Sequence, residues 1–148
     1  MKIIPFEILT LQQEGYHIIL HIELLDKKFK MVLDTGASKT VLDRNTLLEA
    51  GIDEQKLKET SILSSGLGTN EMQSAIFTLP YLKIADWECK KFEVAVLDLS
   101  TINYAYSQID ADPVVGVLGG DILHSYGAII NYKKKTLHLN EKRRKLAE

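Results

Sequence analysis

An apolar run that ends in a single acid, followed at once by a hydroxyl residue and a glycine, is the most constraining feature of this sequence. The apolar residues 31–33 lead into Asp34, then Thr35, Gly36 and two small residues follow before the chain becomes apolar again at residues 41–42. This pattern predicts a buried strand that carries a carboxylate to the tip of a tight loop. Gly36 allows the backbone to approach closely, and the small neighbours leave room for a ligand.

The composition is that of one ordinary globular domain. The 148 residues are 45% apolar and 26% charged, which suits a single domain with a single core. A net charge of −2 and a pI near 6.1 give no global attraction to nucleic acid or to an anionic membrane. Cys89 is the only cysteine, which excludes an intrachain disulfide and a thiolate-rich zinc site. We expect no metal and no cofactor.

We expect neither a membrane span nor a signal peptide in this sequence. No apolar run approaches the roughly 20 residues that a membrane-spanning helix needs, so we expect no membrane span. Pro5 and Glu7 interrupt the N-terminal apolar region, and no small-residue cleavage site follows, so residues 1–7 do not read as a signal peptide. We expect a cytoplasmic protein if the chain is complete, and a secreted or periplasmic one if a signal peptide has been removed.

Strands dominate the first 33 residues, with turns at residues 12–15 and 26–28. After the acidic loop, residues 43–50 suit a short helix with Asp43 as its N-cap, and residues 52–58 suit a second helical turn.

His17 and His21 fall on one face of the strand expected over residues 16–25. A metal pair is the functional interpretation. A solvated strand face is favoured, because no carboxylate or third histidine follows at ligand spacing.

A glycine-rich segment lies between two strand-like stretches. Residues 64–70 have turn composition, and residues 60–63 and 72–79 flank them, so we expect a β-hairpin with a mobile tip. An ordinary hairpin loop is an equal alternative. Phosphate binding is disfavoured, because neither a helix pattern nor the lysine of a phosphate-binding loop follows.

The second half of the chain predicts further strands and short helices. Strands are expected over residues 81–85 and 88–97, with Trp87 in the turn between them as a packing residue. Residues 98–113 form a weakly patterned connection that has room for a short helix. The remaining segments expected are a buried strand before Gly119, a helix over 120–126, and strands from 128 and over 135–139.

The loop over residues 33–38 and the segment Val117, Leu118 and Gly119 together resemble the single-domain, retroviral-like aspartic proteases. That family has an apolar strand, Asp-Thr-Gly, a flap hairpin that folds over the substrate, then an apolar-apolar-glycine strand and a helix, and all appear here once in that order. The resemblance implies a mainly β fold: a closed or partly closed β-barrel of the acid-protease type with one or two short helices. We expect the protease-like domain to cover residues 1–140, with a basic tail over 141–148.

The resemblance also implies a reaction that one chain cannot complete. Peptide hydrolysis without a metal needs a base to activate water and an acid to protonate the carbonyl oxygen, and two carboxylates sharing a proton supply both. The chain has one Asp-Thr-Gly, so the second acid would come from a second copy in a two-fold homodimer. The implied activity is that of an aspartic endopeptidase acting on an extended peptide or protein.

Site roles follow from the resemblance position by position. Asp34 would activate water, Thr35 would hydrogen-bond across the dimer, and the Gly36 backbone would orient the carboxylate. Ala37 and Ser38 would line the cleft. The residues implied for the flap tip are Gly66, Leu67 and Gly68.

The chain departs from the family pattern in three places, and two alternative functions stay open. Retroviral enzymes more often have an acid where this chain has Ser38, so a substrate preference does not carry over. The connection over 98–113 and the basic tail have no obvious counterpart in the shortest viral members, which leaves the mode of dimerisation open. The main alternative function is a catalytically silent dimerisation or peptide-binding module. Nucleic-acid binding by the lysines at 133–135 and the tail is the weakest, and we expect no nucleic-acid partner.

Overall fold

The computed structural model describes residues 1–11, 15–60 and 74–143, and within them the chain is mainly β, as predicted. Two sheets contain all the strands of the described part. The strands of the first half are β1 (Lys2–Pro5), β2 (Glu7–Leu11), β3 (Gly15–Leu24), β4 (Lys27–Leu33), β5 (Val41–Asp43) and β6 (Lys58–Thr60). Those of the second half are β7 (Ser74–Ile84), β8 (Trp87–Leu97), β9 (Gly116–Leu118), β10 (Ile129–Asn131) and β11 (Thr136–Leu139).

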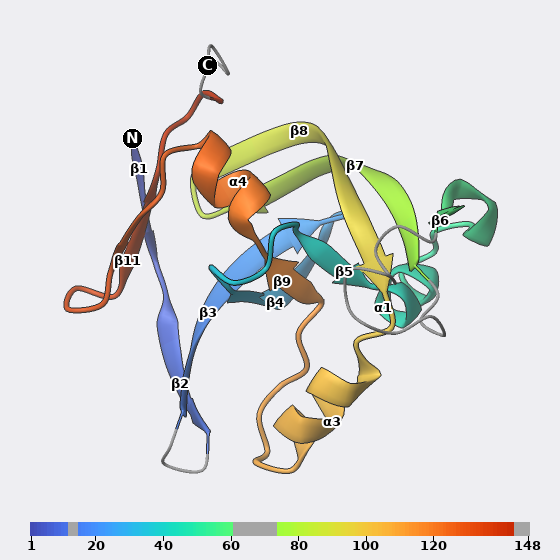
Figure 1. Cartoon of the computed structure of the whole chain (residues 1–148), viewed down its shortest axis with the longest axis horizontal. Coiled ribbons are helices and arrows are strands. Elements are labelled where there is room, and N and C mark those ends of the chain that lie inside the picture. Colours follow the sequence, from blue (N-terminus) through green and yellow to red (C-terminus); the bar gives the residue numbers. More distant parts are fainter. Residues whose placement is uncertain (12–14, 61–73, 144–148) are drawn as a thin grey trace.

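The larger sheet curls into a ring of strands (Figure 1). Its order is β2-β3-β4-β9-β5-β8-β7-β6, and an additional pairing between β3 and β7, at Glu23 and Lys83, closes the ring. The β4–β9 and β5–β8 pairs are parallel, whereas the other neighbours are antiparallel. The sheet expected to close on itself therefore forms a ring of strands. Within it, β9 lies between β4 and β5, the two strands that flank the acidic loop.

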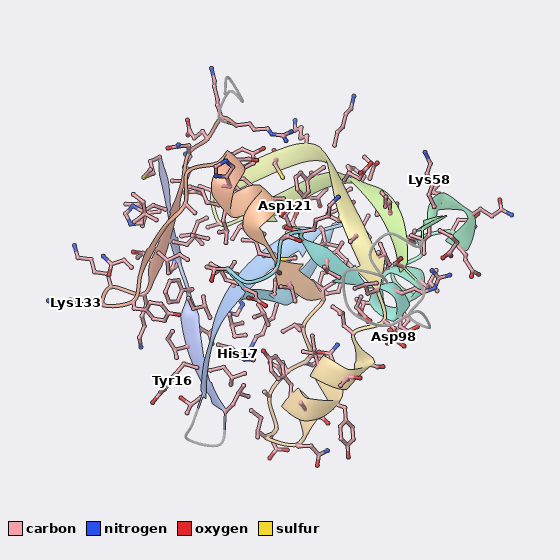
Figure 2. The ribbon with its side chains drawn as sticks, viewed as in Figure 1. Tyr16, His17, Lys58, Asp98, Asp121 and Lys133 are labelled. Atoms are coloured by element: carbon pink, nitrogen blue, oxygen red, sulfur yellow. The ribbon has the colours of Figure 1, made fainter. Side chains whose placement is uncertain are left out.

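The smaller sheet is built from both ends of the described chain. Its order is β1-β11-β10, and β1 pairs antiparallel with β11 over four residues of each strand. Lys133 lies in the turn between β10 and β11 (Figure 2). The two terminal segments are therefore already hydrogen-bonded to each other within one subunit.

The hairpins follow local turn chemistry. Leu25 and Asp26 both have positive φ values, 51° and 60°, as a two-residue turn between antiparallel strands requires. In the β7–β8 hairpin, the segments expected as separate strands over 72–79 and 81–85 belong to one continuous strand, β7, which contains Pro80. The pairing stays in register on both sides of Pro80, which lies opposite Lys91, a residue with a φ of 50°. The missing N–H of proline is thus accommodated by a local distortion of the partner strand.

Short helices occupy the connections. The described residues contain α1 (Arg44–Glu49), α3 (Ser100–Ser107), α4 (Gly120–Ser125) and the single 3-10 turn η1 (Glu54–Lys56), where the fold prediction expects one or two helices. The predicted N-cap is confirmed, because the Asp43 carboxylate accepts the Thr46 N–H at 3.1 Å. Helix α3 fills the weakly patterned connection, and α3 and α4 lie at opposite ends of β9 (Figure 1).

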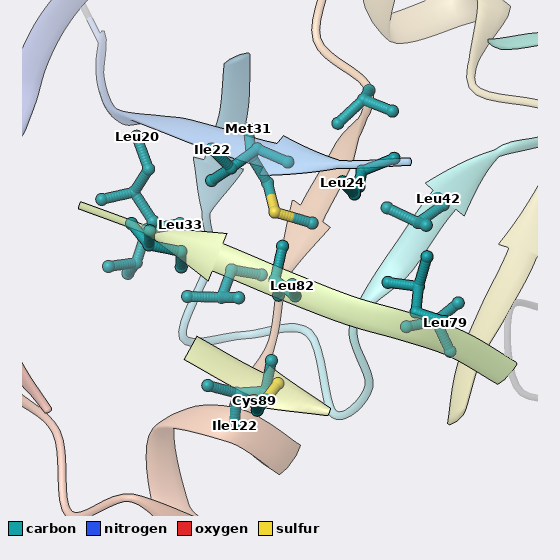
Figure 3. Packing of buried hydrophobic residues seen from close by; sticks show 14 of the residues in the cluster. Leu20, Ile22, Leu24, Met31, Leu33, Leu42, Leu79, Leu82, Cys89 and Ile122 are labelled. Carbon is teal, nitrogen blue, oxygen red and sulfur yellow. The ribbon is translucent and has the colours of Figure 1, made fainter. Parts of the chain in front are cut away.

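The main core fills the ring (Figure 3). Leucines of β3, β5 and β7 meet Met31 of β4 and Ile122 of α4 there, all fully buried. Trp87 is 1% exposed, donates its indole N–H to the Asn140 carbonyl at 2.9 Å and packs edge-on against Tyr126, so the predicted packing role is confirmed. Burial also raises the pKa of the Cys89 thiol to about 11, which keeps it a neutral packing group.

Asp43 is a buried junction between three segments. Its carboxylate accepts N–H donors from Thr46 in α1 and from Leu99 at the start of α3, and its own N–H donates to the Val115 carbonyl at 2.7 Å. The side chain also accepts the Thr46 hydroxyl at 2.6 Å and is 4% exposed. Since these partners come from different parts of the sequence, the carboxylate fixes α1 and α3 against the ring.

We predict that Asp43→Ala lowers the free energy of unfolding by about 2–4 kcal/mol, because it leaves buried N–H groups without acceptors. Chemical denaturation measures the change. The matched control is Asp53→Ala, which removes the exposed N-cap of η1 and a single side-chain hydrogen bond. A loss no larger than that of the control would show that the Asp43 contacts are not what holds the two helices.

Candidate active site

The acidic loop connects β4 to β5 and is held against the end of β9. The Asp34 N–H donates to the Leu118 carbonyl at 3.0 Å, continuing the parallel β4–β9 pairing by one residue. Inside the loop, the Gly36 N–H donates to Asp34 Oδ1 at 2.8 Å, and the Ala37 N–H donates to the Asp34 carbonyl at 3.2 Å. These bonds fix both the backbone and the carboxylate orientation of Asp34.

A close backbone approach at Gly119 brings the second segment of the predicted pair against the loop. A Cβ at Gly119 would lie 2.5 Å from the Lys39 carbonyl oxygen and 2.8 Å from that of Ala37. The next residue, Gly120, donates its N–H to the Ala37 carbonyl at 2.7 Å. Only glycine leaves space for this contact, which explains the Gly119 of the Val-Leu-Gly segment.

Thr40 and Asp121 form a buried contact that sequence reasoning missed. Sequence analysis assigns Asp121 no role, but its carboxylate accepts both the N–H and the hydroxyl of Thr40, the latter at 2.7 Å. The Thr40 hydroxyl oxygen also accepts the Gly119 N–H at 3.1 Å, and Thr40 is 0% exposed. The sequence signal that could have indicated this contact is an acid at the second position of α4, directly after two glycines. Figure 2 labels Asp121 beside the acidic loop.

The loop tip itself is open to solvent. Asp34, Thr35, Gly36 and Ser38 are exposed and Ala37 is half-buried, whereas the neighbouring strand residues 31–33 are buried. Next to the tip is a pocket of about 420 Å³, lined by Asp34 and Thr35 together with residues of β3, β4, α3, β9 and β10. Among the described residues that line it, Asp34 is the one acid. Of the five predicted loop residues, Asp34 and Thr35 therefore line this pocket, and Gly36, Ala37 and Ser38 continue the loop beyond it.

The predicted flap residues, Gly66, Leu67 and Gly68, lie outside the described residues. The strands on either side are described: β6 and β7 pair antiparallel, with Lys58 opposite Ile76. Of the two stems expected, over 60–63 and 72–79, the structure describes Thr60 in β6 and residues 74–79 in β7.

The two histidines of β3 have separate partners. His17 of β3, labelled in Figure 2, forms a hydrogen bond with the hydroxyl of Tyr106 in α3 at 2.6 Å. His21 donates to the Glu7 carboxylate, and that hydrogen bond lowers the pKa of Glu7.

In the described part of the chain, no group of three or more His, Cys, Asp or Glu side chains is placed to hold a metal ion. None of the helices described there is long and apolar enough to cross a membrane.

Comparisons with known proteins agree with this arrangement. A family model described as aspartyl protease matches residues 20–122. A retropepsin-like aspartic protease from Rickettsia conorii is similar in structure, with a TM-score of 0.58 and 24% identity, over 96% of this chain and 90% of that one. The retroviral protease-like domain of Ddi1 from Leishmania major has a TM-score of 0.59 and 12% identity, over 86% of this chain and 90% of that one. No curated protein matched the chain by sequence.

We predict that Thr40→Val destabilises the fold by about 2–3 kcal/mol, because it removes the hydroxyl and leaves the Asp121 carboxylate and the Gly119 N–H short of a partner. Thr40→Ser, which keeps the hydroxyl, is the control and loses less. Thermal or chemical denaturation measures both. A loss in Thr40→Val no larger than that in Thr40→Ser would show that the hydrogen bonds of the hydroxyl do not stabilise the fold.

Proposed function

The chain belongs to the aspartyl protease family and has the retropepsin-like fold, and from that premise we propose that it is an aspartic endopeptidase active as a homodimer. The observation that supports this best is the exposed Asp34 carboxylate, oriented by the Gly36 N–H and anchored through Leu118 at the mouth of a pocket. The carboxylates of Asp43 and Asp121 accept hydrogen bonds from distant segments of the subunit, whereas the Asp34 carboxylate accepts one from Gly36 in its own loop.

The proposed reaction needs two carboxylates at one water molecule. One carboxylate takes a proton from water, whose oxygen attacks the peptide carbonyl carbon, while the protonated partner gives its proton to the carbonyl oxygen. Collapse of the tetrahedral intermediate breaks the C–N bond, with a proton passing to the leaving nitrogen. Since Asp34 is the one acid among the described residues of the pocket, the second acid is proposed to be Asp34 of a second copy.

The remaining loop residues have proposed supporting roles. Thr35, exposed beside Asp34, would hydrogen-bond to the same loop of the second copy and hold the two acids together. Gly36 would border the substrate, and Ala37 and Ser38 would line the cleft near its main chain. Gly66, Leu67 and Gly68 are proposed as the flap tip over the substrate. An extended peptide would then bind as an added strand, with one side chain in the pocket beside Asp34.

The smaller sheet limits how two subunits can associate. Since β1 already pairs over four residues with β11 of its own chain, a partner strand cannot take that place without breaking these bonds. Of the described strands, β10 pairs with β11 alone, so β10 keeps one free edge in this subunit. Ile130 of β10 lines the Asp34 pocket, together with Tyr132, which follows the strand. The proposed dimer therefore uses the free edge of β10 and the exposed loop.

We predict that Asp34→Asn lowers cleavage of an unstructured peptide library by at least about 100-fold at mildly acidic pH, because the amide cannot exchange the proton. The control is Asp86→Asn, an exposed aspartate in the β7–β8 turn. Solution mass, by light scattering at the assay concentration, establishes that the dimer is present. Equal cleavage by wild type and Asp34→Asn, or none by a confirmed wild-type dimer, would contradict the proposal. Peptide binding retained in Asp34→Asn without any wild-type cleavage would favour the silent binding module.

We also predict a bell-shaped dependence of activity on pH with an acidic optimum, because one proton must be shared by the two carboxylates. The rate falls at low pH when both are protonated and at high pH when both are ionised. Initial rates on one peptide over a pH series measure the profile, with circular dichroism at each pH to establish that the fold is intact. A flat profile through neutral pH would contradict a shared proton.

A further inference from the structure

The smaller sheet has one face that is exposed to solvent. The register of its strands places Ile3 of β1, His138 of β11 and Ile129 of β10 opposite one another. Side chains paired across antiparallel strands lie on the same face of a sheet, so these three form a row across it. Ile3 is 62% exposed and Ile129 is 54% exposed. We call this face, with its two exposed isoleucines, the outer face of the smaller sheet.

The opposite face of the same sheet packs against the main core. Ile4 of β1 and Leu137 and Leu139 of β11 are fully buried there, and Ile130 of β10 packs beside them. Since successive side chains of a strand point to opposite faces, the inner face joins the sheet to the ring and the outer face is left uncovered within the subunit. Exposed aliphatic side chains that are grouped in one row and bordered by polar groups indicate a contact surface.

Polar side chains form a second row on the outer face. Pro5, Thr136 and Asn131 are in register across the same three strands. The Thr136 hydroxyl oxygen and His138 Nε2 are 3.2 Å apart, and the Asn131 side-chain oxygen accepts the Lys134 N–H at 2.9 Å. The aliphatic row is therefore bordered by groups that form hydrogen bonds.

Basic side chains flank the outer face at both ends. The lysines at 133–135 are exposed in the turn between β10 and β11, and Figure 2 shows Lys133 at the tip of that turn, pointing away from the ring. At the other end of the sheet, Lys142 and Arg143 are exposed after β11. The aliphatic row thus lies between two groups of positive charge.

The charge of this region differs from that of the rest of the chain. Residues 1–5 and 128–143 contain six of the 18 lysines and arginines but one of the 20 acids. That acid, Glu141, pairs with Lys2 at 3.2 Å. Because the whole chain has a net charge of −2, the remaining residues are acidic in balance and positive charge is concentrated on the smaller sheet. Such a local concentration attracts carboxylates even in a protein that is acidic as a whole.

The lysine turn is held in one position against the sheet. The Phe6 N–H donates to the Lys135 carbonyl at 2.9 Å, and the Phe6 ring packs edge-on against Tyr132 with ring centroids 6.2 Å apart. Lys135 has a φ of 55°, in the left-handed region that tight turns use. The backbone of the three lysines is therefore fixed relative to the aliphatic row, and charge and apolar surface form one defined pattern.

We propose that the outer face of the smaller sheet is a docking surface for an acidic segment of another protein. Aliphatic side chains of that segment would cover Ile3 and Ile129. Its carboxylates would pair with the lysines at 133–135 and, at the other end, with Lys142 and Arg143. The docking surface contains no residue of the acidic loop, so this inference goes beyond the proposed function and does not depend on it.

Other occupants fit the outer face less well. A lipid bilayer would bring hydrocarbon against His138, Thr136 and Asn131, whose polar atoms hydrocarbon cannot hydrogen-bond. Proteins bind single-stranded nucleic acid by stacking bases on aromatic rings as well as by charge, and the two rows include no Phe, Tyr or Trp. A second copy of the chain is proposed above to meet the edge of β10, which leaves this face free. A polypeptide with carboxylates and aliphatic side chains matches both parts of the surface.

The test is a titration of ¹⁵N-labelled protein at neutral pH with acetylated peptides of about twelve residues, long enough in extended form to reach both ends of the sheet. The peptides have Asp and Glu at both ends and Leu, Ile and Val in the middle. We expect chemical-shift changes at the amides of Ile3, His138 and Ile129, and an affinity that falls as NaCl is raised from about 0.05 to 0.5 M. Peptides with Asn and Gln in place of the acids are expected to bind more weakly.

Two variants test the two parts of the surface. Lys133→Glu together with Lys134→Glu is expected to raise the Kd of the acidic peptides at least about tenfold, because two attractions become repulsions. Ile3→Thr, which keeps the β-branch, is expected to raise it about fivefold by removing aliphatic contact. A Kd changed less than twofold by both variants would overturn the proposal.

Matched controls lie on other parts of the subunit. Lys27→Glu together with Lys28→Glu reverses two consecutive exposed lysines of β4, and Tyr104→Ala removes an exposed apolar side chain of α3. Both are expected to bind the acidic peptides as wild type does. Circular dichroism establishes that each variant is folded. A loss of binding in the lysine control as large as that in the turn variant would show that overall charge, and not the outer face, attracts the peptides.

Several further results would overturn the proposal. No change at the three outer-face amides with acidic peptides at millimolar concentration would exclude the docking surface, and changes confined to residues 34–38 would assign the binding to the acidic loop. Stronger binding of phosphatidylserine vesicles or of single-stranded RNA, lost in the Lys133→Glu and Lys134→Glu variant, would assign the face to a membrane or to nucleic acid. A lower solution mass of that variant would assign it to a second copy.

The docking surface and the proposed reaction fail separately. Cleavage of an uncharged peptide by the Lys133→Glu and Lys134→Glu variant is expected to equal that by wild type. Absence of cleavage by wild type would contradict the proposed function, and the docking surface would still be tested, because binding is read from the amides of the smaller sheet.

Discussion

The contact of Thr40 with Asp121 is the constraint on which the site depends. The two residues are 81 positions apart in the sequence, and the carboxylate accepts both the N–H and the hydroxyl of a threonine that is fully buried. The hydroxyl oxygen in turn accepts the Gly119 N–H, so the three groups form one satisfied network. Because the network leaves no buried donor unpaired, the loop end at residue 40 cannot shift relative to α4 without losing several hydrogen bonds together.

That constraint allows the loop tip to stay exposed. Exposed loops normally depend on their own turn hydrogen bonds, and this one has them at Gly36 and Ala37. Its two ends are fixed as well, one to β9 through Leu118 and the other to α4 through Asp121. A carboxylate can therefore point into solvent in a defined orientation before any ligand or second subunit is present. Such preorganisation is what the proposed homodimer would require of the acidic loop in each copy.

The sequence predicted the parts of the fold that depend on neighbouring residues. The strands around the loop, the Asp43 cap and the helix after Gly119 all have local signals in composition and spacing. The Thr40–Asp121 contact and the pairing of β1 with β11 depend on which distant segments meet, which no local pattern records. The strands expected on either side of residue 80 are one strand, because Pro80 is accommodated by the conformation of Lys91 on the partner strand. For the site, Asp34 and Gly36 were evident from the sequence. Ile102 and Tyr106, which line the pocket beside Asp34, lie in a weakly patterned connection.

The segment that contains β9 connects Asp34 to helix α3, which lines the pocket beside Asp34. The Val115 N–H donates to the Lys30 carbonyl of β4 and the Val115 carbonyl accepts the Asp43 N–H, while Val114 is bound in both directions by Asn103 of α3. Four residues after Val114, the Leu118 carbonyl accepts the N–H of Asp34. A displacement of α3 would therefore be transmitted along one short buried strand to the acidic loop. The position of α3 beside the pocket and the position of the Asp34 carboxylate are therefore set by the same stretch of backbone.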